Sequence, residues 1–257
     1  MVTIRAEQMG VRLGRHTAVR GVTLDMPPGQ LVGIIGPNGA GKSSLIRAML
    51  GLVPVSTGSV SLNGRNVAVL SRRAIAQHIA YLPQGQTLHW PLAVERLVAL
   101  GRLPHLGPLS RLTPADEALV DAALVRADVL HLKGRIATEL SGGERARVLL
   151  ARALAVGAPA LIADEPLAAL DPGHQIDVME LLSAEARSGA LVATVLHDLG
   201  MAARYCDRLI LMDRGEAVAD GAPLDVLTRA NLARVYSVDA WIGEEAGRPV
   251  ILPLSRV

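Results

Sequence analysis

The sequence carries, at residues 36–44, the stretch Gly36-Pro37-Asn38-Gly39-Ala40-Gly41-Lys42-Ser43-Ser44. It fits the pattern G-x-x-x-x-G-K-[ST], a glycine-rich turn that joins a strand to a helix and holds phosphate groups. The apolar run 31–35 before it predicts a buried strand, and residues 45–50 after it predict a helix. The glycines allow a tight turn with inward-facing N–H groups, and the helix N-terminus adds partial positive charge. We therefore expect these nine residues to line the phosphate site of a nucleotide.

Two side chains of this stretch have predicted roles of their own. Lys42 is expected to reach the β- and γ-phosphates, and the Ser43 hydroxyl to bind Mg²⁺. Lysine is rare here, because Lys42 and Lys133 are the only two among 26 lysines and arginines. Position 42 therefore favours a compact ammonium group over a guanidinium. The alternative is a glycine-rich turn that binds nothing.

Composition sets wide bounds. A chain of 257 residues can bury one large α/β core, with or without an inserted subdomain. Half of its residues are hydrophobic while phenylalanine is absent, so the core is expected to be aliphatic. The net charge of +2, without a basic run interleaved with aromatics, argues against a nucleic-acid partner.

The chain also gives expectations about its compartment. Its apolar runs are broken before the roughly 18 residues that a membrane span needs, and its first residues lack the apolar core of a signal peptide. Cys206 is the only cysteine, so no internal disulfide can form and a reducing cytoplasm fits. Cys206 itself is predicted to fill space beside a strand rather than to react.

A second site is predicted at residues 158–165, Ala-Pro-Ala-Leu-Ile-Ala-Asp-Glu, an apolar strand that ends in two carboxylates. Asp164 is expected to hold Mg²⁺, directly or through water, and Glu165 to face the attacking water as general base or orienter. Neighbours on a strand point to opposite faces, which suits two separate roles. The alternative is an ordinary solvated strand end.

Residues 140–144, Leu-Ser-Gly-Gly-Glu, precede a predicted helix from Arg145 to Val156. Ser141, Gly142 and Gly143 expose backbone N–H groups at the helix start, which is a second potential phosphate site. One nucleotide does not need two such sites from one chain. We therefore expect a dimer in which each Ser141 loop covers the partner's nucleotide. The alternative is an ordinary N-cap.

Taken together and in this order, the motifs resemble those of the ATP-binding subunits of ATP-binding-cassette (ABC) transporters, over nearly the whole chain. Residues 140–144 match the signature loop of that family, and Asp164 and Glu165 match its Walker B end. The resemblance implies an α/β fold with a RecA-like P-loop ATPase core, an antiparallel β subdomain and an inserted helical subdomain. It also implies ATP and Mg²⁺ at the site, and two copies of the chain around two nucleotides.

The resemblance extends to three more positions. Gln84, after Ile-Ala-Tyr-Leu-Pro at 79–83, matches the Q-loop glutamine, which contacts Mg²⁺ and water and faces the membrane partner. Residues 169–171, Ala-Leu-Asp, match the D-loop, so Asp171 is expected to cross the dimer interface. His197 closes the apolar run 191–196 and matches the switch histidine that contacts the γ-phosphate. The implied catalytic residues are Lys42, Gln84, Glu165 and His197, and the implied metal ligands are Ser43, Gln84 and Asp164.

One position departs from the family pattern. An aromatic residue that stacks on adenine usually lies about two dozen positions before the phosphate loop, and by register this position is Leu13. His16 and Val19 are its neighbours. Whether adenine is stacked, and how selective the site is for the base, stay open.

The motifs divide the chain into parts. Residues 1–84 and 158–230 are predicted to form the core with its β subdomain, 85–157 the helical insert and 231–257 a short tail, either an added strand pair or a docking segment. Residues 57–64 predict a hairpin. Predicted helices cover 92–102, begin near Thr113 and cover 172–188. The last is expected to bury Ile176, Met179 and Leu182.

Two weaker phrases bear on the transport class. Residues 98–105, Val-Ala-Leu-Gly-Arg-Leu-Pro-His, and 247–253, Gly-Arg-Pro-Val-Ile-Leu-Pro, resemble importers of iron–siderophore complexes, haem and cobalamin. The resemblance implies two membrane permease subunits as partners, indirectly an external substrate-binding protein, and a place on the cytoplasmic face of the membrane. Trp90 and Leu92 are expected to face the permease; the alternative is that Trp90 packs within the insert.

Three other classes of protein share part of this pattern. A P-loop GTPase needs an N-K-x-D segment, and neither lysine lies in one. A soluble ABC ATPase shares every catalytic motif but usually has two cassettes or a coiled-coil insertion. An exporter usually carries its own spanning helices. An importer of another small solute stays an alternative.

Overall fold

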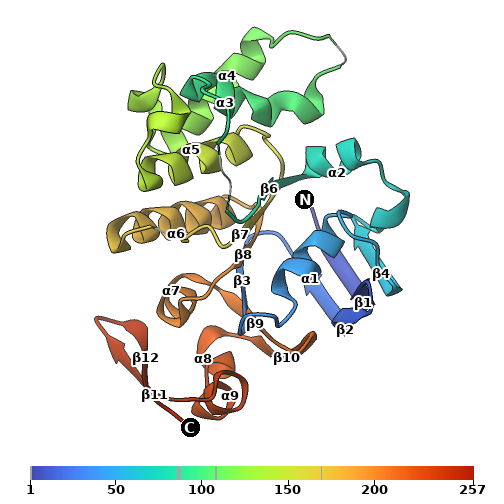
Figure 1. The fold of residues 1–257 in the computed structure, drawn as a ribbon, viewed down its shortest axis with the longest axis vertical. Coiled ribbons are helices and arrows are strands. Elements are labelled where there is room, and N and C mark those ends of the chain that lie inside the picture. The colour runs from blue at the N-terminus through green and yellow to red at the C-terminus, as the bar shows by residue number, and fades with distance from the viewer. Residues whose placement is uncertain (1, 86–87, 108, 169) are drawn as a thin grey trace.

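The computed structural model describes residues 2–85, 88–107, 109–168 and 170–257. A six-stranded sheet runs through its middle in the order β10-β9-β3-β8-β7-β6 (Figure 1). All neighbours in it are parallel except β9 and β10. Its strands are β3 (Leu31–Ile35), β6 (Ile79–Leu82), β7 (Ala160–Asp164), β8 (Leu191–Val195), β9 (Arg208–Asp213) and β10 (Glu216–Gly221).

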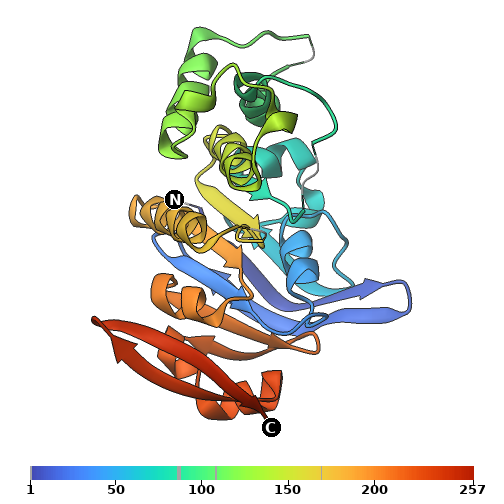
Figure 2. The same cartoon turned by 60° about the vertical axis from the view of Figure 1, so that its left-hand side comes forward.

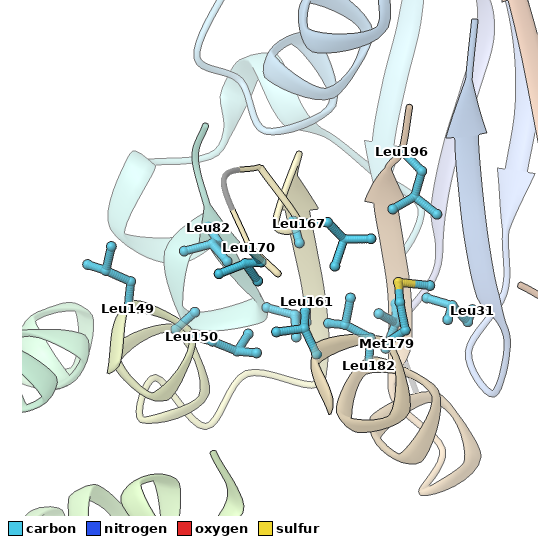
Figure 3. Packing of buried hydrophobic residues seen from close by; sticks show 14 of the residues in the cluster. Leu31, Leu82, Leu149, Leu150, Leu161, Leu167, Leu170, Met179, Leu182 and Leu196 are labelled. Atoms are coloured by element: carbon cyan, nitrogen blue, oxygen red, sulfur yellow. The ribbon is translucent and has the colours of Figure 1, made fainter. Parts of the chain in front are cut away.

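Each central strand is buried on both faces, as its continuous run of apolar residues predicts. Leu31 and Ile35 of β3 face one aliphatic core, and Val32 and Ile34 face the other. The first core includes side chains of α5 (Gly142–Leu154), α6 (Pro172–Arg187) and α7 (Leu199–Tyr205). Figure 3 shows its leucines and Met179 packed between sheet and helices.

The other face is covered by α1 (Lys42–Met49) and by an antiparallel sheet in the order β2-β1-β4-β5. Its strands are β1 (Ile4–Leu13), β2 (His16–Met26), β4 (Thr57–Leu62) and β5 (Arg65–Asn66), and β1 and β2 form the long hairpin in Figure 2. Asn63 and Gly64 have φ of 51° and 75°, as a two-residue hairpin turn requires. The predicted hairpin and the predicted fold class are confirmed.

The remaining helices gather mostly at one end of the molecule, the upper end in Figure 1. The helices and short turns before α5 are η1 (Val67–Val69), α2 (Arg72–His78), α3 (Val94–Ala99), η2 (Leu100–His105), α4 (Pro114–Arg126), η3 (Leu130–Leu132) and η4 (Ala137–Glu139). Thr113 caps α4 with a reciprocal bond to Asp116, which confirms the predicted start. The division of the chain at 84/85, 157/158 and 230/231 stays a prediction.

Arg102, in η2, forms hydrogen bonds with α4 and with the residues that follow α5. Its guanidinium donates to the Asp116 carboxylate at 2.9 Å and to the carbonyls of Ala155 and Val156 at 3.0 and 2.6 Å. Ala155 and Val156 follow the last residue of α5, so a buried cation satisfies carbonyls at that helix end.

The C-terminal residues form an added strand pair, β11 (Val238–Glu245) and β12 (Arg248–Arg256), after the short helices α8 (Pro223–Val226), α9 (Arg229–Asn231) and η5 (Leu232–Tyr236). The strand pair expected in the tail is thus present, and a docking role of the tail stays a prediction. It packs its Ala240 and Ile251 inward, and Trp241 on the outer side is 43% exposed.

Two local predictions need correction. The helix expected over 92–102 begins at Val94, because the Leu92 carbonyl accepts the Ala137 N–H, and it tightens into η2 after Ala99. In α6 the buried face contains Val178, Met179, Leu182 and Ala186, while Ile176 is only half-buried.

Trp90 does not pack within the insert, since 76% of it is exposed. Cys206 is buried as predicted, and burial raises the pKa of its thiol to about 12. None of the helices in the described residues is long and apolar enough to cross a membrane.

Candidate active site

The site lies at the carboxyl edge of the parallel strands. The phosphate loop follows β3, Gln84 follows β6, Glu165 follows β7 and His197 follows β8, and these four strands are consecutive in the sheet, in the order β3-β8-β7-β6. Parallel strands deliver their loops to one edge, which is where α/β folds bind ligands.

The phosphate loop depends on close backbone approaches. A Cβ at Gly36 would lie 2.2 Å from the Met212 carbonyl oxygen, and one at Gly41 would lie 2.3 Å from that of Ala18. Gly41 also has φ of 98° and makes no side-chain cap for α1. The first N–H groups of α1 are thus left without a side-chain cap from Gly41, as an anion site at a helix start requires.

Lys42 is 5% exposed, and its ammonium donates to the carbonyls of Gly36 at 2.7 Å and Pro37 at 3.0 Å. Burial lowers the pKa of this lysine, and the charges of Glu165 and Asp164 oppose that effect. The backbone of the phosphate loop therefore surrounds the ammonium group of Lys42.

Asp164 is almost fully buried and accepts from the Ser43 hydroxyl at 3.2 Å. The Tyr81 hydroxyl lies 3.4 Å from its other carboxylate oxygen. Burial, and then the charge of Glu165, raise the pKa of Asp164, while the Ser43 bond lowers it. The sequence did not predict that Tyr81 contacts this carboxylate. The contact arises because β6, which contains Tyr81, lies directly beside β7, which ends at Asp164.

Glu165 is held between two side chains. One carboxylate oxygen accepts from the Gln84 amide at 2.5 Å, and the other lies 2.7 Å from Nε2 of His197. Glu165 lies past the end of β7 with φ of 54°, so a left-handed backbone aims it. The expectation that strand alternation separates its role from that of Asp164 was wrong on this point.

A magnesium ion fits the donor set beside it. The Ser43 hydroxyl and the Asp164 carboxylate are adjacent oxygen donors. A bound cation would offset the desolvation cost of the buried carboxylate charge. Within the described ranges no group of three His, Cys, Asp or Glu side chains could hold a metal alone. Mg²⁺ normally completes such a site with substrate phosphates and water. Gln84, the third predicted ligand, donates to Glu165 in this structure, and its contact with Mg²⁺ stays a prediction.

Leu13 lies beside the phosphate loop and is 47% exposed. It lines a cavity of about 240 Å³ with His16, Ala18 and Asn38 and with residues 39–44 and Glu165. A base attached to phosphates in the loop would meet the tip of the β1–β2 hairpin here.

The Ser141 loop is a capped helix start. The Ser141 hydroxyl accepts from the Glu144 N–H at 3.3 Å, and Glu144 accepts from the Ser141 N–H at 2.8 Å. Gly142 lines a second cavity, of about 290 Å³, with Leu82, Arg145 and Glu165 among its other walls. The loop is therefore an N-cap, and its predicted contact with a nucleotide remains a prediction.

Asp171 caps α6 by accepting from the backbone N–H of His174 at 3.0 Å. Ala169, the first residue of the predicted D-loop, lies outside the described residues. The structure thus brings Lys42, Ser43, Gln84, Asp164, Glu165 and His197 to one sheet edge.

A phosphate loop after one parallel strand, with the buried Asp164 and the adjacent Glu165 at the end of β7 in the same sheet, defines a P-loop ATPase. The family model described as "ABC transporter" matches residues 19–168, more than half of the sequence. The chain belongs to the ABC transporter family, as an ATP-binding subunit whose ATPase activity is coupled to transport.

Relatives of known name match over the whole length. The chain is 43% identical over 256 residues to the hemin import ATP-binding protein HmuV of Pseudomonas fluorescens. The alignment covers 97% of this chain and 99% of that protein. It is 42% identical over 265 residues to HmuV of Bordetella avium, which covers 98% and 99%.

Solved structures agree with the fold. A metal-chelate type ABC transporter in an inward-facing conformation matches with a TM-score of 0.85 at 24% identity, covering 99% of this chain and 98% of that one. The dimeric bacterial ABC transporter cassette MJ0796 matches with a TM-score of 0.76 at 25% identity, covering 86% and 99%.

Proposed function

We propose that this chain hydrolyses ATP to drive the import of a metal chelate, with haem as the first candidate and ferric siderophores or cobalamin as the others. The observation that carries the substrate class is its full-length similarity to proteins named for hemin import. The transported compound would touch membrane permease subunits and an external binding protein rather than this chain. The chain itself would lie on the cytoplasmic face of the membrane.

The chemistry follows from the side chains at the sheet edge. Lys42 and the N–H groups of the loop stabilise the charge that develops on the phosphates of ATP, which is usually the largest catalytic contribution. Glu165 accepts a proton from, or orients, the attacking water, and it must release Gln84 or His197 to do so. Ser43 and Asp164 would hold Mg²⁺, which would supply positive charge against the phosphates.

We further propose that each nucleotide is enclosed by two copies of the chain. The phosphate loop and Gly142 line two different cavities of one chain, which share Glu165. A Ser141 loop from a partner would add a second helix N-terminus to the cavity of the phosphate loop, opposite that of α1, and Asp171 would lie at the same interface.

Mixing two inactive variants tests this composite site. Lys42→Ala disables the phosphate loop of its own chain, and Ser141→Arg blocks the site of the partner. In a mixed dimer, one site combines an intact Lys42 with an intact Ser141. We expect the mixture to recover ATP hydrolysis, measured as phosphate release, whereas either variant alone stays inactive. A silent mixture would contradict the composite site.

Transport is tested in proteoliposomes that hold this chain with its permease subunits. ATP inside the vesicles should drive uptake of haem delivered by the binding protein, and the same vesicles with Glu165→Gln should not transport. Uptake of a ferric siderophore or cobalamin instead would reassign the substrate. Failure to co-purify with any polytopic membrane protein after mild detergent extraction would favour a soluble ABC ATPase.

A further inference from the structure

His174 is held by both oxygens of one carboxylate. Its backbone N–H donates to one oxygen of Asp171 at 3.0 Å, and its ring Nδ1 lies 2.8 Å from the other. The backbone bond from His174 is the largest cause that lowers the pKa of Asp171, so this carboxylate is ionised at neutral pH and can only accept. Nδ1 therefore carries a proton, and its bond to Asp171 orients the ring.

That ring lies directly against Gly143. A Cβ at Gly143 would come within 2.9 Å of Nδ1 and within 3.1 and 3.2 Å of two ring carbons of His174. Gly143 does not have a positive φ, so its backbone conformation would accept any residue. The contact with His174, rather than the turn, leaves no room for a side chain at this position.

Gly143 is the second residue of α5, between Ser141 and Glu144 of the capping box. Asp171 is the N-cap of α6. The imidazole thus connects the starts of two helices, 30 positions apart in the chain. Each start belongs to a loop that the proposed dimer places at its interface.

We propose that His174 is a positioning residue that ties the Asp171 loop to the Ser141 loop of the same chain, so that both loops present themselves to the partner's nucleotide as one rigid unit. This inference rests on the composite site proposed above. Its consequence is local: His174 serves the site to which its chain gives the Ser141 loop, and not the site of its own phosphate loop.

Mixed dimers separate these two sites. In the pair described above, the Lys42→Ala chain donates the Ser141 loop and the Ser141→Arg chain donates the phosphate loop. His174→Ala placed in the first chain should lower the restored rate by about fivefold to 100-fold, the range expected for a small misplacement of catalytic groups. The same substitution placed in the second chain should leave the restored rate within about twofold. Equal effects, or the reverse order, would overturn the proposal.

A measurement on the unmixed chain keeps the test independent of the dimer. Hydrogen exchange of the backbone amides in 141–146 should become about tenfold faster or more in His174→Ala, because the loop loses its cover. Affinity for a fluorescent ATP analogue, which reports the chain's own phosphate loop, should not change. An unchanged hydrogen-exchange rate in His174→Ala would refute the contact between the two loops, whatever the mixed dimers do. If the exchange becomes faster but the mixed dimers recover no ATP hydrolysis, the result would count against the composite site alone.

Two matched variants divide the tie into its parts. His174→Asn keeps an N–H donor at the place of Nδ1 but removes the ring from Gly143. His174→Phe keeps a ring on Gly143 but loses the bond to Asp171. Each should recover only part of the protection of 141–146. Full recovery by either one would show that one half of the contact suffices and would disprove the coupling of the two loops.

Discussion

Glu165 has φ of 54°, a conformation that costs a residue other than glycine on the order of 1–3 kcal/mol. The rest of the site maintains it, because both carboxylate oxygens are bonded, one to Gln84 and one to His197. The sequence predicted these three residues but not their contact. Each follows a different strand, so their meeting depends on the strand order of the sheet.

Glu165→Gln should retain ATP binding and lose turnover. The amide keeps the shape and an acceptor oxygen but takes no proton from water, and loss of a catalytic base typically lowers the rate about 10²–10⁴-fold. Phosphate release measures the rate, and size exclusion with ATP should show a stable dimer. Hydrolysis at the unaltered rate would remove Glu165 from the mechanism.

Leu13→Tyr should tighten ATP binding. Leu13 lines the cavity of the phosphate loop, and an aromatic ring stacked on a base contributes roughly 1–3 kcal/mol, or about fivefold or more in affinity. Titration with a fluorescent ATP analogue measures it, and Leu13→Ala is the control without a ring. Equal affinities for all three proteins would mean that position 13 does not reach the base.

At the scale of elements, the parts next to the motifs could be predicted well. Strands β3, β7 and β8 are continuous apolar runs bounded by glycine, proline or charge, which is typical of buried parallel strands. The start of α3 could not, because the Leu92 carbonyl is occupied by the N–H of Ala137, 45 positions later. Local propensity contains no information about such a partner.

Because of Asp116 at the start of α4, the free energy of unfolding should decrease at acidic pH. The backbone N–H of Thr113, its hydroxyl and then Arg102 lower the pKa of Asp116 to about 2. A pKa below the unfolded value of roughly 3.9 stabilises the fold above that pH, and this contribution is lost as the pH falls from about 4 to about 2. The unfolding free energy of the protein, measured in urea, should exceed that of Asp116→Asn at pH 6, and the difference should shrink across this window. A constant difference would contradict the assignment.

At the scale of the whole molecule, the sheet separates two aliphatic cores and presents the site at one edge. This layering could be predicted from the alternation of strands and helices around the phosphate loop. The bond network of Arg102 and the contact of His174 with Gly143 could not, since both join residues that are distant in the sequence and unremarkable where they stand.

Docking on the permease should involve Trp90. Its side chain is exposed beside the half-buried Leu92, and truncation of an aromatic side chain at the centre of an interface often costs about 2 kcal/mol, roughly thirtyfold in affinity. Trp90→Ala should co-purify poorly with the permease subunits while binding ATP normally. Val69→Ala, at another exposed apolar residue, is the control. Undiminished co-purification would exclude Trp90 from the interface.

The exposure of both tryptophans also determines how the molecule behaves under light. Trp90 and Trp241 are the only indoles of the chain, they stand at the surface, and no phenylalanine accompanies them. Because Trp90 is 76% and Trp241 43% exposed, we expect their native emission to lie near that of indole in water and to change little on denaturation. The same property makes the unlabelled chain its own optical sensor: a blue shift on addition of a partner would register coverage of one of these two indoles.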